Sequence, residues 1–214
     1  MADNYLEKRF EEVFGASARK KTVIRRNNPS IDTLLHRNRS YRGYDQSHVV
    51  TEAQLREIVS VNTLIPSAMN RQPLRFHLVT RDTGSEKILS NIRMGAALPE
   101  LHLPLPGTAP EAFIVVCSAL EEDKFVDIDL GISLQSMLLK ATSAGLNGLI
   151  ICAFDRMAIT EALHLRYPPL AILAIGKGAE SIFIRPIHSG DSQTYYRKDG
   201  IHYVPKLALE DLLI

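Results

Sequence analysis

The sequence predicts a domain in which strands and helices alternate around one hydrophobic core. Three uninterrupted apolar runs, residues 112–119, 149–154 and 170–175, have the length and composition of buried strands. Helical patterns lie between them, over residues 127–145 and 158–165. The chain has 214 residues, of which 45% are hydrophobic and 23% charged, and this suits a single globular domain. Taken alone, the alternation favours a parallel α/β sheet.

Charge and composition exclude several classes of partner. The net charge is +1, so no overall field draws the chain to nucleic acid or to a membrane. No apolar run approaches the ~20 residues of a membrane span, and residues 1–4 lead into charged residues rather than into a signal sequence. Cys117 and Cys152 each lie inside an apolar run. We therefore expect a cytoplasmic protein with two buried free thiols.

Residues 1–30 are expected to form an N-terminal helical arm, separate from a main domain over residues 31–214. Apolar residues recur at helical spacing among charges in the first half of this arm. The basic run over residues 20–26 that follows is most simply a solvated surface.

Two short helices should follow the arm. Residues 31–37 carry apolar side chains at helical spacing, and either Ser30 or Asp32 can cap them. Residues 51–54 form a capping box, a hydroxyl followed three positions later by glutamine. The helix that starts there should stop before Pro66, which cannot easily continue it.

The next segments combine one clear strand with a long irregular stretch. Residues 74–80 alternate between apolar and polar types and predict a strand, and a helix should cover about residues 85–92. Residues 94–111 contain too many prolines and glycines for a long element. A loop of this length inside a compact domain more often has a function than serves only as a connection.

The helix predicted over residues 127–145 is unusual. Asp127 and Asp129 lie at its start, where the helix dipole favours acidic side chains. No charge occurs between Asp129 and Lys140, and apolar residues lie on nearly every face. Such a helix is expected to be buried on all sides, in the core or at a subunit contact. The tail beyond Gly176 shows only weak structure.

Several common catalytic motifs are missing from the sequence. The segment 176–178 lacks the third glycine of a dinucleotide-binding fingerprint. The sequence contains no HExxH motif, no CxxC motif and no cluster of histidines, so it does not predict a zinc site. Ser133 lies inside a helix rather than in a GxSxG turn. If the chain is an enzyme, an organic cofactor therefore carries the chemistry.

A basic segment is the first candidate for binding such a cofactor. Arg39 and Arg42 place two guanidinium groups around the hydroxyl of Ser40. Guanidinium groups bind phosphate oxygens, or the electron-rich edge of a flavin, in a forked geometry. When such a sequence stands alone, an ordinary surface segment is the commoner explanation.

The loop Pro66–Pro73 is the second candidate. Asn70 and Gln72 offer uncharged donors and acceptors, which suit the uracil-like edge of a flavin. Ser67 and Ala68 are small enough for a flat ring to approach the backbone, and the two terminal prolines stiffen the loop. An ordinary turn between a helix and a strand explains the segment equally well by itself.

Together the two segments resemble the nitroreductase family of FMN-dependent oxidoreductases. The family's Arg-Arg-Ser-x-Arg motif is matched by residues 39–42, with Asn38 in place of the first arginine. Its Pro-Ser-x-x-Asn-x-Gln-Pro-Trp motif is matched by residues 66–73, with Leu74 in place of the tryptophan.

Three further segments resemble the same family, and the likeness covers about residues 31–214. The segment 127–146 resembles the long helix at the family's dimer interface. The segment 148–155 resembles a strand whose end offers backbone N–H groups to the flavin, with Ala153 in place of the usual glycine. The segment 205–210 resembles one whose basic residue contacts the FMN phosphate.

The resemblance implies an α+β fold with a mixed, mostly antiparallel sheet flanked by helices, in an intertwined homodimer. This expectation replaces the parallel sheet, because periodicity does not give strand direction. The resemblance also implies FMN at the subunit interface and NADH or NADPH as electron donor. A nitroaromatic, quinone or similarly flat acceptor would be reduced in the second of two half-reactions, and residues 94–110 are the candidate wall of its pocket.

The resemblance implies no catalytic side chain, because the flavin performs the chemistry. Arg39, Ser40 and Lys206 are expected at the phosphate, with Arg197 or Lys198 as a further cation there. Arg42 is expected at the reduced ring. Asn70 and Gln72 are expected at the ring edge or the ribityl chain. The full set of expected cofactor contacts is Arg39, Ser40, Arg42, Pro66, Ser67, Ala68, Asn70, Gln72, Ile151, Cys152, Ala153, Arg197 and Lys206.

Other functions are compatible with the same sequence. Family relatives with other flavin chemistry, such as ene reduction, dehalogenation or flavin destruction, are one alternative. A protein that binds or stores flavin without turning it over is a second. A flavin-free interaction protein that uses the basic arm within residues 1–30 is a third.

Overall fold

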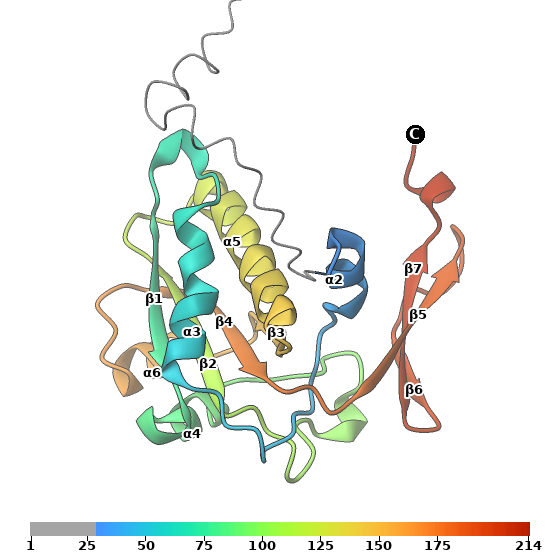
Figure 1. Cartoon of the computed structure of the whole chain (residues 1–214), viewed down its shortest axis with the longest axis horizontal. Helices are drawn as coiled ribbons and strands as arrows, with labels where there is room; N and C mark the ends of the chain where they lie inside the picture. The colour runs from blue at the N-terminus through green and yellow to red at the C-terminus, as the bar shows by residue number, and fades with distance from the viewer. Residues whose placement is uncertain (1–28) are drawn as a thin grey trace, which may run out of the picture.

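A computed structural model describes residues 29–214 of the chain (Figure 1). The predicted arm, residues 1–30, lies almost entirely outside these described residues. Within the described range, no helix has both the length and the apolar character needed to cross a bilayer.

The centre of the protein is a four-stranded sheet in the order β1-β2-β4-β3. Its strands are β1 (Leu74–Val79), β2 (Ala112–Ser118), β3 (Asn147–Ile151) and β4 (Pro169–Gly176). Every neighbouring pair is antiparallel. The α+β fold with a mostly antiparallel sheet is thus confirmed, and the parallel sheet that the alternation alone favours is wrong.

The strand direction differs from that expectation because one strand is inserted between two others. β2 and β3 both run antiparallel to β4, so they are parallel to each other, and helix α5 (Lys124–Ser143) joins them. This connection is a βαβ crossover, and β4 enters between its strands from later in the chain. Uninterrupted apolar runs report burial on both faces of a sheet, not the direction of its strands.

Helices cover both faces of this sheet. On one face, α3 (Glu52–Val59) and α5 enclose a core that includes Ile114 of β2. On the other face, α4 (Ser85–Leu89) and α6 (Arg156–Ala162) enclose a second core that includes Phe113. β2 supplies both cores from alternate residues, which explains why its sequence does not alternate.

The helix ends follow the signals in the sequence. Ser30 caps α2 (Ile31–Arg37), where its side-chain oxygen accepts a hydrogen bond from a backbone N–H. Thr51 and Gln54 form the predicted capping box of α3, and a 3-10 helix continues the chain to Thr63. The predicted irregular stretch, residues 94–111, contains one short 3-10 helix.

A second sheet follows β4 and corrects the prediction of a weakly structured tail. Its strands are β5 (Ser181–Ile187), β6 (Tyr196–Lys198) and β7 (Ile201–Leu207), in the order β5-β7-β6. β5 and β7 are parallel, whereas β6 and β7 form a hairpin whose turn, Asp199–Gly200, has positive φ at both residues. An Asp-Gly pair is a strong sequence signal for such a turn. In Figure 1 this C-terminal sheet lies to one side of the four-stranded sheet.

Helix α5 is not buried on all sides within one chain, so its predicted burial in the core is wrong, and its place at a subunit contact stays a prediction. Val126 and Met137 are fully buried, but Phe125 and Ile128 are exposed. The helix also begins three residues earlier than predicted, because Asp123 caps it through hydrogen bonds to two backbone N–H groups.

The two cysteines differ from each other. Cys117 is buried as predicted, and this burial raises the pKa of its thiol to about 11. Cys152 lies just beyond the end of β3 and is exposed, so the prediction of a buried thiol is wrong there. Both thiols are free.

We expect Thr51→Ala to lower the free energy of unfolding by about 1 kcal/mol, because it leaves a backbone N–H of α3 without its cap. Chemical denaturation at a fixed protein concentration measures this loss. Thr51→Ser keeps the hydroxyl and should cost less than about 0.5 kcal/mol. Equal losses in the two variants would show that the methyl group matters rather than the cap.

Candidate functional site

Helix α5 carries the two predicted binding segments at different points along its length. The polar loop, residues Pro66–Pro73, lies at the N-terminal end of α5, where it contacts Asp129. The basic segment, residues Asn38–Arg42, lies beside the other half of the helix, and its first residue donates to Gln135. The two segments line different cavities. Within one chain, therefore, the fold does not bring them together.

A buried carboxylate fixes the polar loop. Asp129 is only 3% exposed, and it accepts hydrogen bonds from the hydroxyl of Ser67 at 2.6 Å and from the N–H of Ala68 at 2.8 Å. The Ser67 oxygen in turn accepts the N–H of Gln72 at 2.9 Å. Hydrogen bonds to an ionised group are about twice as strong as those between neutral groups. One side chain of α5 thus holds both ends of the loop's turn.

The loop holds three non-glycine residues in the left-handed region of backbone conformation. Met69, Asn70 and Gln72 have φ of 52°, 53° and 47°. Each such residue costs about 1 kcal/mol or more, so neighbouring contacts must offset the strain. Besides the contacts of Asp129, both carboxylate oxygens of Asp123 lie 3.0 Å from Nη2 of Arg71. The result is a rigid loop with two exposed side-chain amides.

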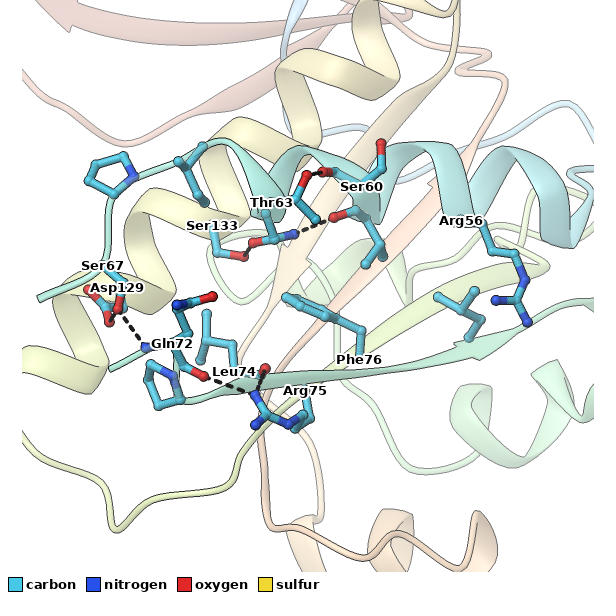
Figure 2. Close-up of a pocket in the computed structure, with 16 residues that line it drawn as sticks. Arg56, Ser60, Thr63, Ser67, Gln72, Leu74, Arg75, Phe76, Asp129 and Ser133 are labelled. Carbon is cyan, nitrogen blue, oxygen red and sulfur yellow. Dashed lines mark hydrogen bonds between the residues drawn. The ribbon is translucent and has the colours of Figure 1, made fainter. Parts of the chain in front are cut away.

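Behind the polar loop lies a cavity of about 540 Å³, which we call the loop cavity (Figure 2). Its walls come from α3 and the following 3-10 helix, from the edge strand β1 and from α5. Of the predicted site residues, Pro66, Ser67 and Gln72 line it. Ala68 and Asn70 belong to the loop but are not among the lining residues.

The basic segment lines a second cavity, of about 350 Å³, which we call the basic cavity. Arg39, Ser40 and Arg42 meet Lys206 of β7 there. Among the described residues, the lining of this cavity includes three cations, Arg39, Arg42 and Lys206, and no carboxylate. Ile150 of β3 is one of the apolar residues in the same lining. The fold therefore unites the four residues predicted at the phosphate and the reduced ring.

Backbone pairing fixes the basic segment against β3. Ser40 forms an isolated parallel bridge with Gly148, whose carbonyl accepts the N–H of Tyr41 at 3.2 Å. A Cβ atom at position 148 would lie 2.5 Å from Cδ2 of Leu138 and 2.8 Å from the carbonyl oxygen of Ala174. Glycine at this position therefore allows β3 to pack closely against α5 and β4.

The C-terminal sheet is attached to the site through Glu180. Its carboxylate accepts the backbone N–H groups of Arg42 and Gly43 and forms an ion pair with Arg197. Arg197 therefore has a partner within the chain, and it lines a smaller cavity of about 180 Å³ beside Arg42. Its contact with a cofactor stays a prediction.

The end of β3 lies elsewhere within a single chain. Ile151 is buried in the core, whereas Cys152 and Ala153 line a further cavity of about 520 Å³. None of the three lines the basic cavity, although Ile150 does. Ile151 points to the opposite face of the sheet from Ile150, and Cys152 and Ala153 lie beyond the end of the strand. A contact through their backbone N–H groups also stays a prediction.

β7 contributes two lining residues that the sequence analysis does not single out. His202 and Val204 line the basic cavity together with Lys206. His202, Val204 and Lys206 are two positions apart, and in a strand this spacing places them on one face. The sequence could therefore have indicated His202 and Val204 if the tail had been recognised as a strand. Within residues 29–214, no group of three or more His, Cys, Asp or Glu side chains is placed to hold a metal ion.

We expect Asp129→Ala to lower the free energy of unfolding by about 3 kcal/mol, because it leaves the Ser67 hydroxyl and the Ala68 N–H without their acceptor. Chemical denaturation measures the loss. Asp127→Ala removes an exposed carboxylate from the same helix and should cost less than about 1 kcal/mol. A similar cost for both variants would mean that Asp129 does not anchor the loop.

Comparison with known proteins identifies the family. A family model described as the nitroreductase family matches residues 35–177. The protein YdgI of Bacillus subtilis (strain 168), provisionally named an NAD(P)H nitroreductase, is 24% identical, and the match covers 69% of this chain and 88% of YdgI.

Solved structures share the fold. A provisionally named nitroreductase of Desulfovibrio desulfuricans in complex with FMN has a TM-score of 0.61 at 22% identity, covering 87% of this chain and 96% of its own. A nitroreductase family protein of Clostridium novyi NT has a TM-score of 0.56 at 20% identity, covering 70% and 87%. A variant of the FMN- and NADPH-dependent nitroreductase NfnB of Sphigopyxis sp. strain HMH has a TM-score of 0.56 at 18% identity. The match covers 71% of this chain and 89% of the NfnB chain. Since the family model spans more than half of the sequence, this chain belongs to the nitroreductase family.

Proposed function

We propose that the chain is an FMN-dependent oxidoreductase that uses NADH or NADPH to reduce nitroaromatic, quinone or similarly flat acceptors. The observation that carries this proposal is the basic cavity, whose described lining combines three cations with apolar residues and includes no carboxylate. FMN and a reduced nicotinamide also appear in the names of similar proteins, which supports the choice of cofactor and donor.

The residues of the basic cavity fit the phosphate end of FMN. Arg39 and Arg42 each have a buried Nε atom without a hydrogen-bond partner among the described residues. Guanidinium groups and the Lys206 ammonium are donors suited to phosphate oxygens, and Ser40 adds a hydroxyl. Arg39, Ser40 and Lys206 would hold the phosphate, while Arg42 and the apolar lining residue Ile150 suit the ring system.

FMN, when bound, supplies two-electron hydride-transfer chemistry between NAD(P)H and the acceptor. The side chains of the protein bind and orient. The fixed positive charge of Arg42 would favour the negative charge of the reduced ring. Asn70 and Gln72 would offer neutral donors and acceptors to the ring edge. Their rigid loop would keep these amides in place without further loss of conformational freedom.

This proposal requires two chains. The loop contact at Asp129 and the basic-cavity residue Leu138 are separated by roughly 14 Å along the axis of α5. In one chain, the polar loop therefore lies away from the basic cavity. A two-fold pair that places the polar loop of one chain at the basic cavity of the other would create two equivalent sites.

Exposed apolar surfaces support such a pair. Ile31 of α2 and Ile128 of α5 are 58% and 53% exposed, and Leu35 and Phe125 lie exposed on the same two helices. α2 and α5 contact each other, and each helix leaves apolar side chains exposed. Apolar patches of this kind on a soluble protein commonly mark interfaces. The C-terminal sheet, which lies apart from the main sheet in Figure 1, would extend the contact.

The segment 94–110 is the proposed wall of the acceptor pocket. Leu103, Leu105 and Thr108 line the small cavity beside Arg42. The N–H of Ala97 donates to the hydroxyl of Tyr195, a lining residue of the basic cavity, at 3.1 Å. These contacts support a place for the segment next to the cofactor.

The first test is an absorbance spectrum of the purified protein, which should show bound flavin, followed by anaerobic titration with NADH and NADPH. Bleaching by either donor, and reoxidation by a quinone or a nitroaromatic, is the expected result. A flavin that neither donor reduces would instead indicate a binding or storage protein. A colourless protein that takes up no added FMN would refute the proposal.

We expect Lys206→Ala to raise the Kd for FMN by about tenfold, since one charge-assisted contact to phosphate is lost. Riboflavin lacks the phosphate, and its affinity should not change. Lys198→Ala is the matched control, because Lys198 is an exposed lysine of the same sheet outside the basic cavity. Equal effects of the two variants on FMN would remove Lys206 from the site.

A mixed dimer tests whether the site is shared. One chain carries Arg39→Ala and Lys206→Ala, the other Asn70→Ala and Gln72→Ala, and each homodimer should retain little FMN. Heterodimers purified through two different tags should regain about one FMN per pair, because one of the two sites combines both intact halves. No regain would show that both halves come from the same chain.

A further inference from the structure

We propose that His202 is a phosphate-binding residue of the FMN site, where it acts as a neutral hydrogen-bond donor through Nδ1. The proposal rests on the proposed function, and it adds to the basic cavity a residue that the family-like motifs of the sequence do not include.

The first observation is the position of His202. It lies on β7 four residues before Lys206, so the two side chains share one face of the strand. Both line the basic cavity with Arg39 and Ser40. His202 is only 2% exposed, so its polar atoms depend on partners within the protein or on a ligand.

The second observation is its hydrogen bonding. Nε2 of His202 lies 3.4 Å from Nη1 of Arg42, and a guanidinium group can only donate. Nε2 is therefore the acceptor of the ring, and the proton of the neutral imidazole lies on Nδ1. That Nδ1 is buried and has no partner among the described residues. Buried donors are nearly always hydrogen-bonded, so an acceptor is missing beside this ring.

The third observation is the charge of the ring. Burial, and then the cations Arg42 and Arg197, lower the pKa of His202 to about 4. The ring is therefore neutral near pH 7, and it adds a donor to the site without adding a fourth repelling cation. Phosphate oxygens accept hydrogen bonds, and the positive charges of Arg39, Arg42 and Lys206 in the same cavity would balance the negative charge of a phosphate.

Aromatic packing holds the ring in place. The ring of Tyr195 lies 5.2 Å from that of His202 at an interplanar angle of 52°, and the Arg42 guanidinium lies 4.7 Å from the centre of the Tyr195 ring. His202, Tyr195 and Arg42 thus form one packed group, and the imidazole donor is oriented before a ligand arrives.

The test measures the Kd of the apoprotein for FMN and for riboflavin by flavin fluorescence. His202→Gln places its amide at the position of Nε2 and lacks the Nδ1 donor, so it should raise the Kd for FMN by about tenfold. His202→Asn places its amide at the position of Nδ1 and should stay within about threefold of the wild type. Riboflavin affinity should be the same in all three proteins, and thermal unfolding checks that the variants are folded.

Each other outcome overturns a defined claim. Unchanged FMN affinity of His202→Gln would show that a water molecule, not the phosphate, satisfies Nδ1. Parallel losses of FMN and riboflavin, or equal losses in the Asn and Gln variants, would show that the ring only supports the structure. A wild type that binds FMN but prefers it no more than riboflavin would refute phosphate binding in this cavity, whereas a wild type that binds neither flavin would refute the proposed function itself.

Discussion

The contact between Asp129 and the polar loop is the constraint on which the geometry of the site depends. Met69, Asn70 and Gln72 occupy backbone conformations that cost about 1 kcal/mol or more each. Hydrogen bonds to a buried carboxylate contribute about 1.5–3 kcal/mol each, and Asp129 accepts two of them from this loop. The total cost of the three strained residues and the total gain from the two hydrogen bonds are of similar size. The loop therefore keeps its shape only while α5 presents this carboxylate. The polarity of Asp129, unusual for a buried position, is thereby explained.

Helix α5 also sets the distance between the two halves of the proposed site. It holds the polar loop at its beginning and lines the basic cavity with Gln135 and Leu138, while its buried residues belong to the main core. Because a helix is stiff over this length, neither half can move toward the other within a chain. The proposed site, which needs both halves, therefore draws them from two copies of the chain, and α2 and α5 each leave apolar residues exposed.

The sequence predicted what local chemistry determines, and it missed what distant contacts determine. The capping box of α3 and the residue pattern of the polar loop are local, since each lies within eight positions. The conformation of that loop depends in addition on the distant Asp129. The direction of β4 and the exposure of Cys152 depend on which segments pack against them, and no local pattern contains that information. The same holds for Glu180 and His202, which gain their roles only when the C-terminal sheet reaches the basic segment. The chain's resemblance to a family supplied strand direction, whereas periodicity alone gave the wrong sheet.

Overall charge is equally uninformative about the basic cavity, for a physical reason. The net charge of the chain is +1, yet three cations meet in one cavity without a carboxylate among the described lining residues. Glu180 makes this possible. It neutralises Arg197, but it binds only the backbone N–H of Arg42 and leaves the positive side chain of that residue to the cavity. Since a field focused in a cleft acts locally, the positive charge of this cavity depends on where the carboxylates lie and not on composition.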